Sequence, residues 1–182
     1  MPMLEQRIQQ QFFESADLLS QTAEALSKPI ADAAQALLGC ITAGGKVLLC
    51  GSGGDALLAQ HAAGLMVGRF ERERPGLAAL SVAGQSEVLA LGTPGDVLLA
   101  ITAGPAEPAL LAAVSAAQRK EMTIVALTGR DAASLQKHLS ETDVLIAAPH
   151  ERAARVYETH TLVLHCLCDA VDLQLLGEQE PT

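Results

Sequence analysis

Aromatic residues are scarce in this sequence. Its 182 residues include no tryptophan, one tyrosine and three phenylalanines, although 49% of the residues are hydrophobic. The core must therefore be filled by Ala, Leu, Val and Ile, whose side chains allow helices to approach each other and a sheet closely. A chain of this length is expected to form one domain and to bury a sizeable core.

Basic residues and long apolar runs are also few. Lys and Arg total 12 against 21 Asp and Glu, which gives a formal net charge of −9. The chain thus lacks the clustered cations that bind nucleic acids or anionic membranes, and we expect neither as a partner. No apolar run approaches the length of about 18 residues that crosses a bilayer. The first residues also lack the basic and apolar regions of a signal peptide, so we expect a cytoplasmic protein.

The four cysteines form no known metal or redox motif. Cys166 and Cys168 are separated by one residue rather than the two of a thioredoxin-type pair, and no second pair completes a zinc site. Cys40, Cys50 and these two all lie in or beside apolar runs. We therefore expect four buried, reduced thiols.

Short apolar runs alternate with helical patterns after residue 45. Strands are predicted over 47–50, 77–82, 97–101, 123–127 and 144–147, and helices over 55–70, 86–91, 107–119, 132–139 and 152–176. This alternation predicts an α/β fold, a three-layer αβα arrangement around a five-stranded parallel sheet, as in flavodoxin-like proteins. Apolar residues at helical spacing predict two further helices before it, the second starting after Pro29.

The predicted organisation is a single domain over 1–182. It comprises an N-terminal helical pair over 1–44, an αβα core over 45–176 and a polar tail over 177–182. The link between the second and third strands, 83–95, is short for a crossover between parallel strands. Arg69, Arg72 and Arg74 alternate with Glu71 and Glu73, a pattern typical of exposed ion pairs.

The first predicted strand runs into a glycine-rich turn, Gly51-Ser52-Gly53-Gly54, and then into a helix. A strand, a glycine turn and a helix N-terminus together direct several backbone N–H groups at one point, an arrangement that suits a phosphate group. Asp55 stands at the start of that helix, where we expect its carboxylate to cap the first turn.

Several segments resemble the sugar isomerase (SIS) domain of the phosphoheptose isomerase group. They are CGSGG at 50–54, AQH at 59–61, GRFERERP at 68–75, PGDVLLAIT at 94–102, MTIVALTGRD at 122–131 and RVYETHTLVLHCLCD at 155–169. Within that group the chain looks similar to a branch that associates with the bacterial replication initiator DnaA. The resemblance implies an SIS fold assembled as a homotetramer, with ligand sites at strand C-termini near subunit boundaries.

The resemblance also implies a set of site residues, and this chain keeps only part of it. In the isomerases a His and a Glu on the helix after the turn, with a Gln and a His on the last helix, hold zinc and include the acid/base pair. His61 and His165 occupy the two histidine positions, but Leu65 and Tyr157 stand where the Glu and the Gln belong. Leucine neither accepts a proton nor binds a metal. We therefore predict no metal or other cofactor, with zinc possible only if His61 and His165 recruit a further ligand, and we interpret the two histidines as vestigial.

The implied phosphate site departs in the same way. Asp55 replaces a serine, and in the loop after the third strand only Thr102 keeps a hydroxyl while Glu107 replaces another serine. Two carboxylates would repel a phosphate. The candidate ligand-binding residues are Gly51, Ser52, Gly53, Gly54, Asp55, Thr102 and Glu107.

Three functions are compatible with this pattern. The hypothesis that the altered site favours is a non-catalytic scaffold that binds the replication initiator, with Leu175 and Leu176 as candidate protein-binding residues. The first alternative is a phosphoheptose isomerase acting on sedoheptulose 7-phosphate. The second is a regulatory domain that binds a small ligand through Asp55, Thr102 and Glu107.

Overall fold

The computed structural model describes residues 2–178, and in this part of the chain it contains six helices and five strands. In chain order they are α1 (Pro2–Thr42), β1 (Val47–Gly51), α2 (Gly54–Val67), β2 (Ala79–Val82), α3 (Gln85–Leu91), β3 (Val97–Ile101), α4 (Pro108–Arg119), β4 (Thr123–Thr128), α5 (Ala133–Gln136), β5 (Val144–Ala147) and α6 (Ala153–Leu176). The strands form one parallel sheet in the order β2-β1-β3-β4-β5. The predicted α/β fold with a five-stranded parallel sheet is confirmed.

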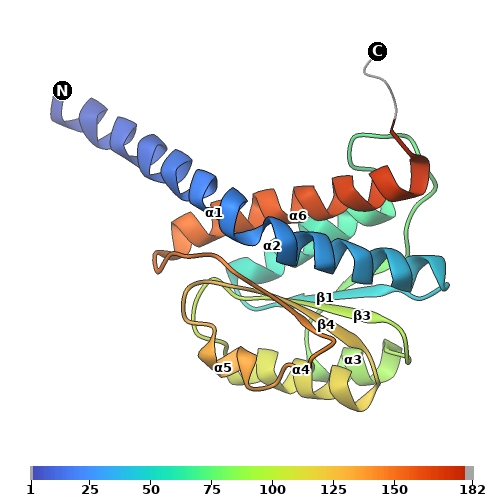
Figure 1. Cartoon of the computed structure of the whole chain (residues 1–182). Helices are drawn as coiled ribbons and strands as arrows, with labels where there is room; N and C mark the ends of the chain where they lie inside the picture. The colour runs from blue at the N-terminus through green and yellow to red at the C-terminus, as the bar shows by residue number, and fades with distance from the viewer. Residues whose placement is uncertain (1, 179–182) are drawn as a thin grey trace.

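Helices cover both faces of the sheet. Figure 1 shows α1, α2 and α6 on one face and α3, α4 and α5 on the other. Each face has its own apolar core, one centred on Leu37, Leu49 and Leu167 and the other on Leu48, Leu98 and Leu110. Because both faces are covered, β3 is buried at all five of its positions, which explains its continuous apolar sequence.

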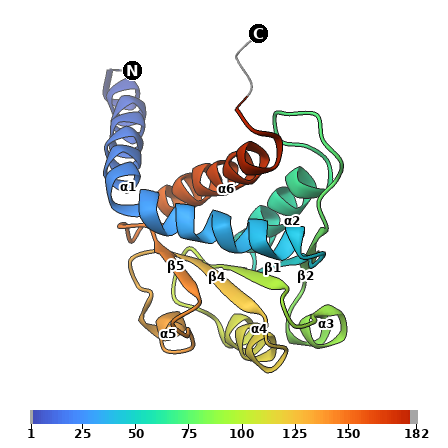
Figure 2. The same cartoon turned by 45° about the vertical axis from the view of Figure 1, so that its right-hand side comes forward.

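The N-terminal region differs from the prediction, because α1 is one helix of 41 residues rather than two. Pro29 lies inside it, and proline removes a helical hydrogen bond and clashes with the preceding turn, which bends a helix. Figure 2 shows the two halves of α1 running in different directions. The first half is held against α6 by Arg155, which donates to the carbonyl of Gln11 at 2.7 Å. Although α1 is long, neither it nor another described helix is apolar enough to cross a membrane.

Other differences from the prediction are small in extent. β2 begins at Ala79 rather than at residue 77, and α2 ends at Val67, three residues before Phe70. Cys40, Cys50 and Cys168 are buried and free, but Cys166 is exposed, since it lies on the outer face of α6. Of the polar tail predicted over 177–182, residues 179–182 lie outside the described residues.

Arg74 is a further correction. It does not form an exposed ion pair but donates to Asp172 on α6 at 2.5 Å, and the side chains of both residues are 1% exposed. The partner is 98 residues away in sequence, so the local alternation of charges could not reveal it. Arg69 does form the expected exposed pair, with Glu73.

Candidate functional site

The glycine turn lies where the connections of the sheet reverse direction. After β1 the chain continues into α2 on one face, and after the neighbouring β3 it continues into α4 on the other face. In parallel α/β sheets the carboxyl ends of two such strands form the usual ligand-binding crevice. The Gly51–Gly54 turn and the loop that starts at Thr102 meet at this point. The structure therefore brings the two predicted segments together.

The glycines of the turn are required by close contacts. A Cβ on Gly51 would lie 2.7 Å from the backbone of Asp55, and a Cβ on Gly54 would lie 2.6 Å from the hydroxyl oxygen of Tyr157. Gly53, at the N-terminal boundary of α2, has a φ of 55°, in the left-handed region that glycine favours. The tyrosine that replaces the expected glutamine thus lies directly against the turn.

Asp55 does not cap α2, contrary to the prediction. The N-cap residue is Gly53, and no side chain bonds the first turn. The Asp55 Oδ1 atom instead accepts a hydrogen bond of 3.1 Å from the backbone N–H of Ala103, in the loop after β3. Asp55 therefore links the two loops of the crevice.

Burial raises the pKa of Asp55 to about 6, and the nearby Glu107 carboxylate adds to the effect, while the Ala103 hydrogen bond opposes it. Burial and the neighbouring Asp55 also raise the pKa of Tyr157. Asp55 and Glu107 thus lie close enough to interact, as the sequence predicted. Their carboxylates would repel a phosphate placed at the turn itself.

The other candidate ligand-binding residues differ in how accessible they are. Ser52 is partly exposed on the turn. Thr102 is buried, and its hydroxyl donates to the carbonyl of Gly104 at 2.9 Å. Ser52 is consequently the hydroxyl of this group that is more available to a ligand.

His61 and His165 meet between α2 and α6. Their Nε2 atoms are 3.3 Å apart, and their rings are arranged edge to face with centroids 5.6 Å apart. Phe70 packs against His165, with 5.3 Å between the ring centroids. His61 is exposed and His165 is half-buried, so solvent or a ligand can reach the pair.

The residues around this pair do not fit the zinc site that the resemblance implies. Leu65 packs against the apolar core, and Tyr157 lies against Gly54. His160 is fully buried and bonds the Thr128 carbonyl at 3.0 Å instead of turning towards the pair. Among residues 2–178, no three His, Cys, Asp or Glu side chains gather closely enough to hold a metal ion. Two imidazoles alone make an incomplete zinc site.

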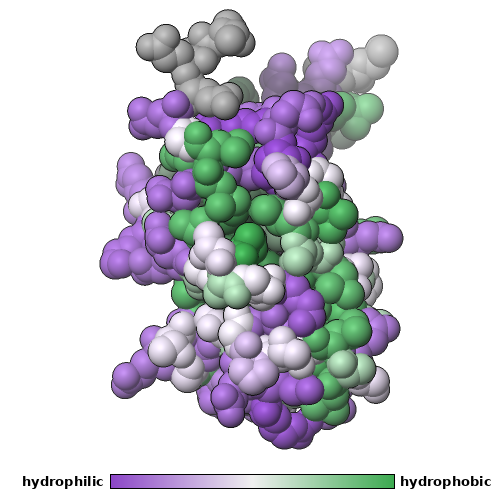
Figure 3. Space-filling view, turned by 90° about the vertical axis from the view of Figure 1, so that its right-hand side faces the viewer, coloured by the Kyte–Doolittle hydropathy of each residue, from purple (hydrophilic) through white to green (hydrophobic). Residues whose placement is uncertain are grey.

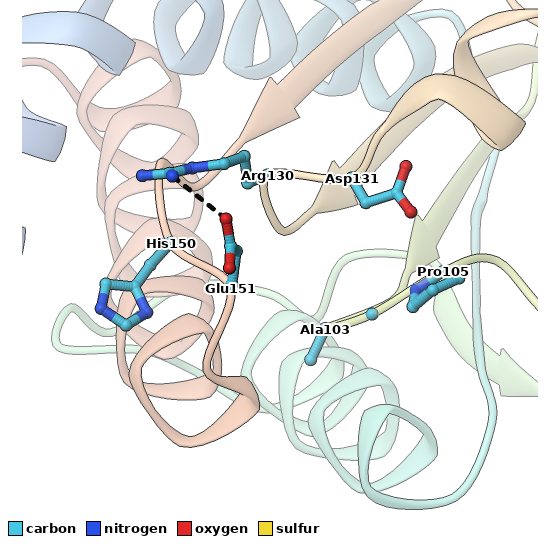
Figure 4. Close-up of a pocket in the computed structure, with 7 residues that line it drawn as sticks. Ala103, Pro105, Arg130, Asp131, His150 and Glu151 are labelled. Carbon is cyan, nitrogen blue, oxygen red and sulfur yellow. Dashed lines mark hydrogen bonds and ion pairs between the residues drawn. The ribbon is translucent and has the colours of Figure 1, made fainter.

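A neighbouring pocket was not anticipated from the sequence. It has a volume of about 390 Å³ and lies among the loops that follow β3, β4 and β5 (Figure 4). Arg130 crosses it to Glu151 at 3.2 Å, and the Nδ1 atom of His150 accepts a hydrogen bond from the backbone of Arg152 at the start of α6. The pocket shares Ala103 with the crevice. No local motif marks it, because its residues come from three separate loops.

Leu175 and Leu176, the predicted protein-binding residues, are the last two residues of α6, whereas the crevice lies at the carboxyl ends of β1 and β3. With Ile41, Pro75 and Leu77 they line a hollow of about 270 Å³, on the partly apolar end of the molecule that Figure 3 shows. They are 37% and 36% exposed. Their role in binding a protein stays a prediction.

A family model described as the SIS domain matches residues 11–129. The chain belongs to the SIS domain family. The match spans the glycine turn, both loops of the crevice and the strands from β1 to β4.

Individual relatives place this SIS domain in the phosphoheptose isomerase group. It is 58% identical over 200 aligned positions to the phosphoheptose isomerase of Methylibium petroleiphilum, with all of both chains covered. It is 43% identical to that of Thiobacillus denitrificans over 97% of this chain and 99% of the relative. Because the first alignment has more positions than this chain's 182 residues, that relative has residues that this chain lacks.

Solved structures agree with the fold of this SIS domain. A phosphoheptose isomerase from Neisseria gonorrhoeae superposes with a TM-score of 0.87 at 35% identity, over 93% of this chain and 98% of the other. One from Francisella tularensis gives 0.88 at 35% identity, over 94% and 99%.

These relatives contradict the main functional hypothesis. We expected a non-catalytic scaffold that binds the replication initiator, but the full-length relatives carry the name of an isomerase. The expectation was wrong because it gave the substitutions at positions 55, 65 and 157 more weight than the rest of the chain. An isomerase relationship is the reading that these relatives favour.

Proposed function

We propose that this SIS domain is an aldose–ketose isomerase that acts on a sugar phosphate. The observation that carries the proposal is the similarity, at 58% identity over the whole of both chains, to a protein named phosphoheptose isomerase. The substrate that this name suggests is sedoheptulose 7-phosphate.

The chemistry needs two proton-transfer groups. A ketose becomes an aldose when a base takes a proton from C1 while the C2 oxygen gains one, which forms an enediol. A proton then returns to carbon at C2, and the O1 hydroxyl loses its proton to give the aldehyde. The contact between His61 and His165, with 3.3 Å between their Nε2 atoms, supports the proposal because imidazoles both accept and donate protons near neutral pH.

The crevice offers polar groups to hold the substrate nearby. α2 begins at the glycine turn and carries His61 two turns further along, so turn and histidine belong to one rigid element. The Ser52 hydroxyl is available at the turn. The substrate phosphate would lie away from Asp55 and Glu107, because their carboxylates would repel it.

We further propose that the site is completed by other copies of this chain in a homotetramer. α2 is apolar nearly all round, yet Leu57 and Val67 on it are 68% and 53% exposed. A helix that is apolar on every side is normally buried. His61 lies on this helix, so a second copy that covers it would also enclose the histidine pair.

A second candidate function is binding of a sugar ligand without turnover. It is favoured by Leu65 and Tyr157, which replace a carboxylate and an amide that the resemblance assigns to the isomerase site. In this second function the crevice still binds a sugar, but the protein does not catalyse its isomerisation.

One experiment separates the two functions. The purified protein is incubated with sedoheptulose 7-phosphate, and formation of the aldose phosphate is followed by NMR, while ligand binding is followed by the shift of the thermal unfolding midpoint. Turnover supports the isomerase. A shift without turnover supports the second candidate. If the folded protein shows neither turnover nor a shift, both functions are rejected.

A further inference from the structure

The position of Leu65 raises the question of which group acts in place of the missing carboxylate. Leu65 lies one helical turn after His61 on α2 and packs against the core. Its side chain can neither take nor give a proton. Any second proton-transfer group must therefore come from elsewhere near His165.

We propose that His61 is this group, and that His61 and His165 form a proton-transfer pair that works without a metal ion. The catalytic part of the proposal rests on the proposed isomerase function. The pair itself is a property of the folded chain and can be tested separately.

The contact between the rings specifies complementary protonation. A hydrogen bond between two Nε2 atoms requires one of them to carry a hydrogen and the other to present a lone pair. When both rings are neutral, one is therefore protonated at Nε2 and the other at Nδ1. These are the donor and the acceptor that the two ends of an enediol step require.

The surroundings of the pair favour this role over metal binding. Nitrogen ligands about 2.0–2.1 Å from a tetrahedral zinc lie about 3.3–3.4 Å apart, so the separation alone does not distinguish the two roles. The residues at the remaining ligand positions distinguish proton transfer from metal binding. Leu65 and Tyr157 occupy the other two positions, and no third His, Cys, Asp or Glu joins the pair within the described residues.

In the reaction that we infer, the substrate replaces the contact between the two rings, and the imidazole whose Nε2 atom carries the lone pair takes the proton from C1 of the ketose. The other imidazole gives its Nε2 hydrogen to the C2 oxygen, so the enediol forms between one imidazolium and one imidazolate ring. The first imidazole, now protonated, returns a proton to C2, and the second recovers its hydrogen from the O1 hydroxyl. Both rings end in their starting state, and no other reactant is needed.

The first test measures the pair without any substrate. Zinc is titrated into the wild-type protein by calorimetry, and nitrogen NMR of histidine-labelled protein reports the ring tautomers. We expect no zinc binding tighter than about 100 μM and one ring in each tautomer. The double variant Leu65→Glu/Tyr157→Gln restores two oxygen donors and should gain at least about 100-fold in zinc affinity. Tight zinc binding by the wild type that is lost in His61→Asn would overturn the proposal.

The second test measures turnover. His61→Asn and His165→Asn should each lower kcat by about 10²–10⁴-fold, and a chelator should leave the wild-type rate unchanged. His138→Asn, a histidine outside the site, is the matched control. Full activity of His61→Asn, or loss of activity with the chelator and recovery with zinc, would refute the inference while the isomerase function stood. Absence of turnover in the wild type would refute the isomerase function, and the zinc and tautomer measurements would still decide the nature of the pair.

Discussion

At the scale of single residues, Arg74 shows how a buried charge can organise a surface segment. Its guanidinium donates to Asp172 and to the backbone carbonyls of Leu65, Met66 and Gly68. It thereby fixes the end of α2, the following segment and α6 relative to one another. Because His61 lies on α2 and His165 on α6, the same ion pair helps to hold the two histidines in contact.

We predict that Arg74→Ala lowers the free energy of unfolding by about 3–5 kcal/mol, because it leaves Asp172 buried without a partner. Urea denaturation measures the change. Arg69→Ala is the control, since the Arg69 side chain is 59% exposed and its pair with Glu73 should contribute less than about 1 kcal/mol. Equal losses in the two variants would contradict the structural role of Arg74.

A second residue-scale prediction concerns His160. Burial lowers its pKa from 6.5 to about 4, although the bond to the Thr128 carbonyl opposes this shift. Between these values the unfolded chain holds more protons than the folded chain. Stability due to neutral His160 is therefore complete above about pH 6.5 and is lost as the pH falls towards 4.

The variant His160→Gln should accordingly show a weaker loss of stability on acidification, by as much as about 3 kcal/mol over this range. Denaturant unfolding at a series of pH values measures it. The comparison must be with the wild type, because the raised pKa of Asp55 acts in the opposite direction, adding stability as the pH falls from about 6 towards 3.8. Parallel pH profiles for the two proteins would contradict the prediction.

At the scale of elements, most of the fold could be predicted, but the unbroken course of α1 could not. β3 and β4 were clear because buried central strands are apolar at consecutive positions. The continuity of α1 through Pro29 was missed, because proline usually starts a helix and only packing against α6 shows that here it bends one.

In the candidate site, the sequence indicated the segments that meet but not the contacts between them. The glycine turn can be recognised from consecutive residues. The Asp55–Ala103 hydrogen bond, in contrast, joins residues 48 positions apart, and the histidine contact joins residues 104 positions apart. Asp55 was therefore assigned to the nearest donors, the first turn of its own helix, while the fold supplies a donor from the loop after β3. The sequence showed that a carboxylate stands at position 55, but it did not show which N–H group that carboxylate bonds.

At the scale of the whole molecule, the large apolar side chains of the described residues that are at least half exposed lie on two helices. The first half of α1 presents Leu4, Ile8, Phe12 and Phe13 at exposures of 50% or more, and α2 presents Leu57 and Val67. Exposed apolar faces of this kind usually mark protein contacts. They support the proposed association of several copies around the histidine pair.

We predict that Leu57→Asp, which places a charge on the exposed face of α2, converts the proposed homotetramer into smaller species. Size-exclusion chromatography with light scattering measures the mass. Leu89→Asp is the control, since Leu89 is also exposed but lies on α3 at the opposite face of the sheet. A wild-type monomer, or an unchanged mass for Leu57→Asp, would contradict the assembly that we propose.

The central claim is that this SIS domain moves a proton between C1 and C2 of a sugar phosphate through His61 and His165. The most direct measurement incubates the wild type and His165→Asn with sedoheptulose 7-phosphate in deuterium oxide and follows deuterium at C1 and C2 by NMR. We predict that the wild type forms the aldose phosphate and introduces deuterium at the reacting carbons, whereas His165→Asn does so at least about 100-fold more slowly. If the folded wild type shows neither conversion nor deuterium incorporation, the claim is contradicted.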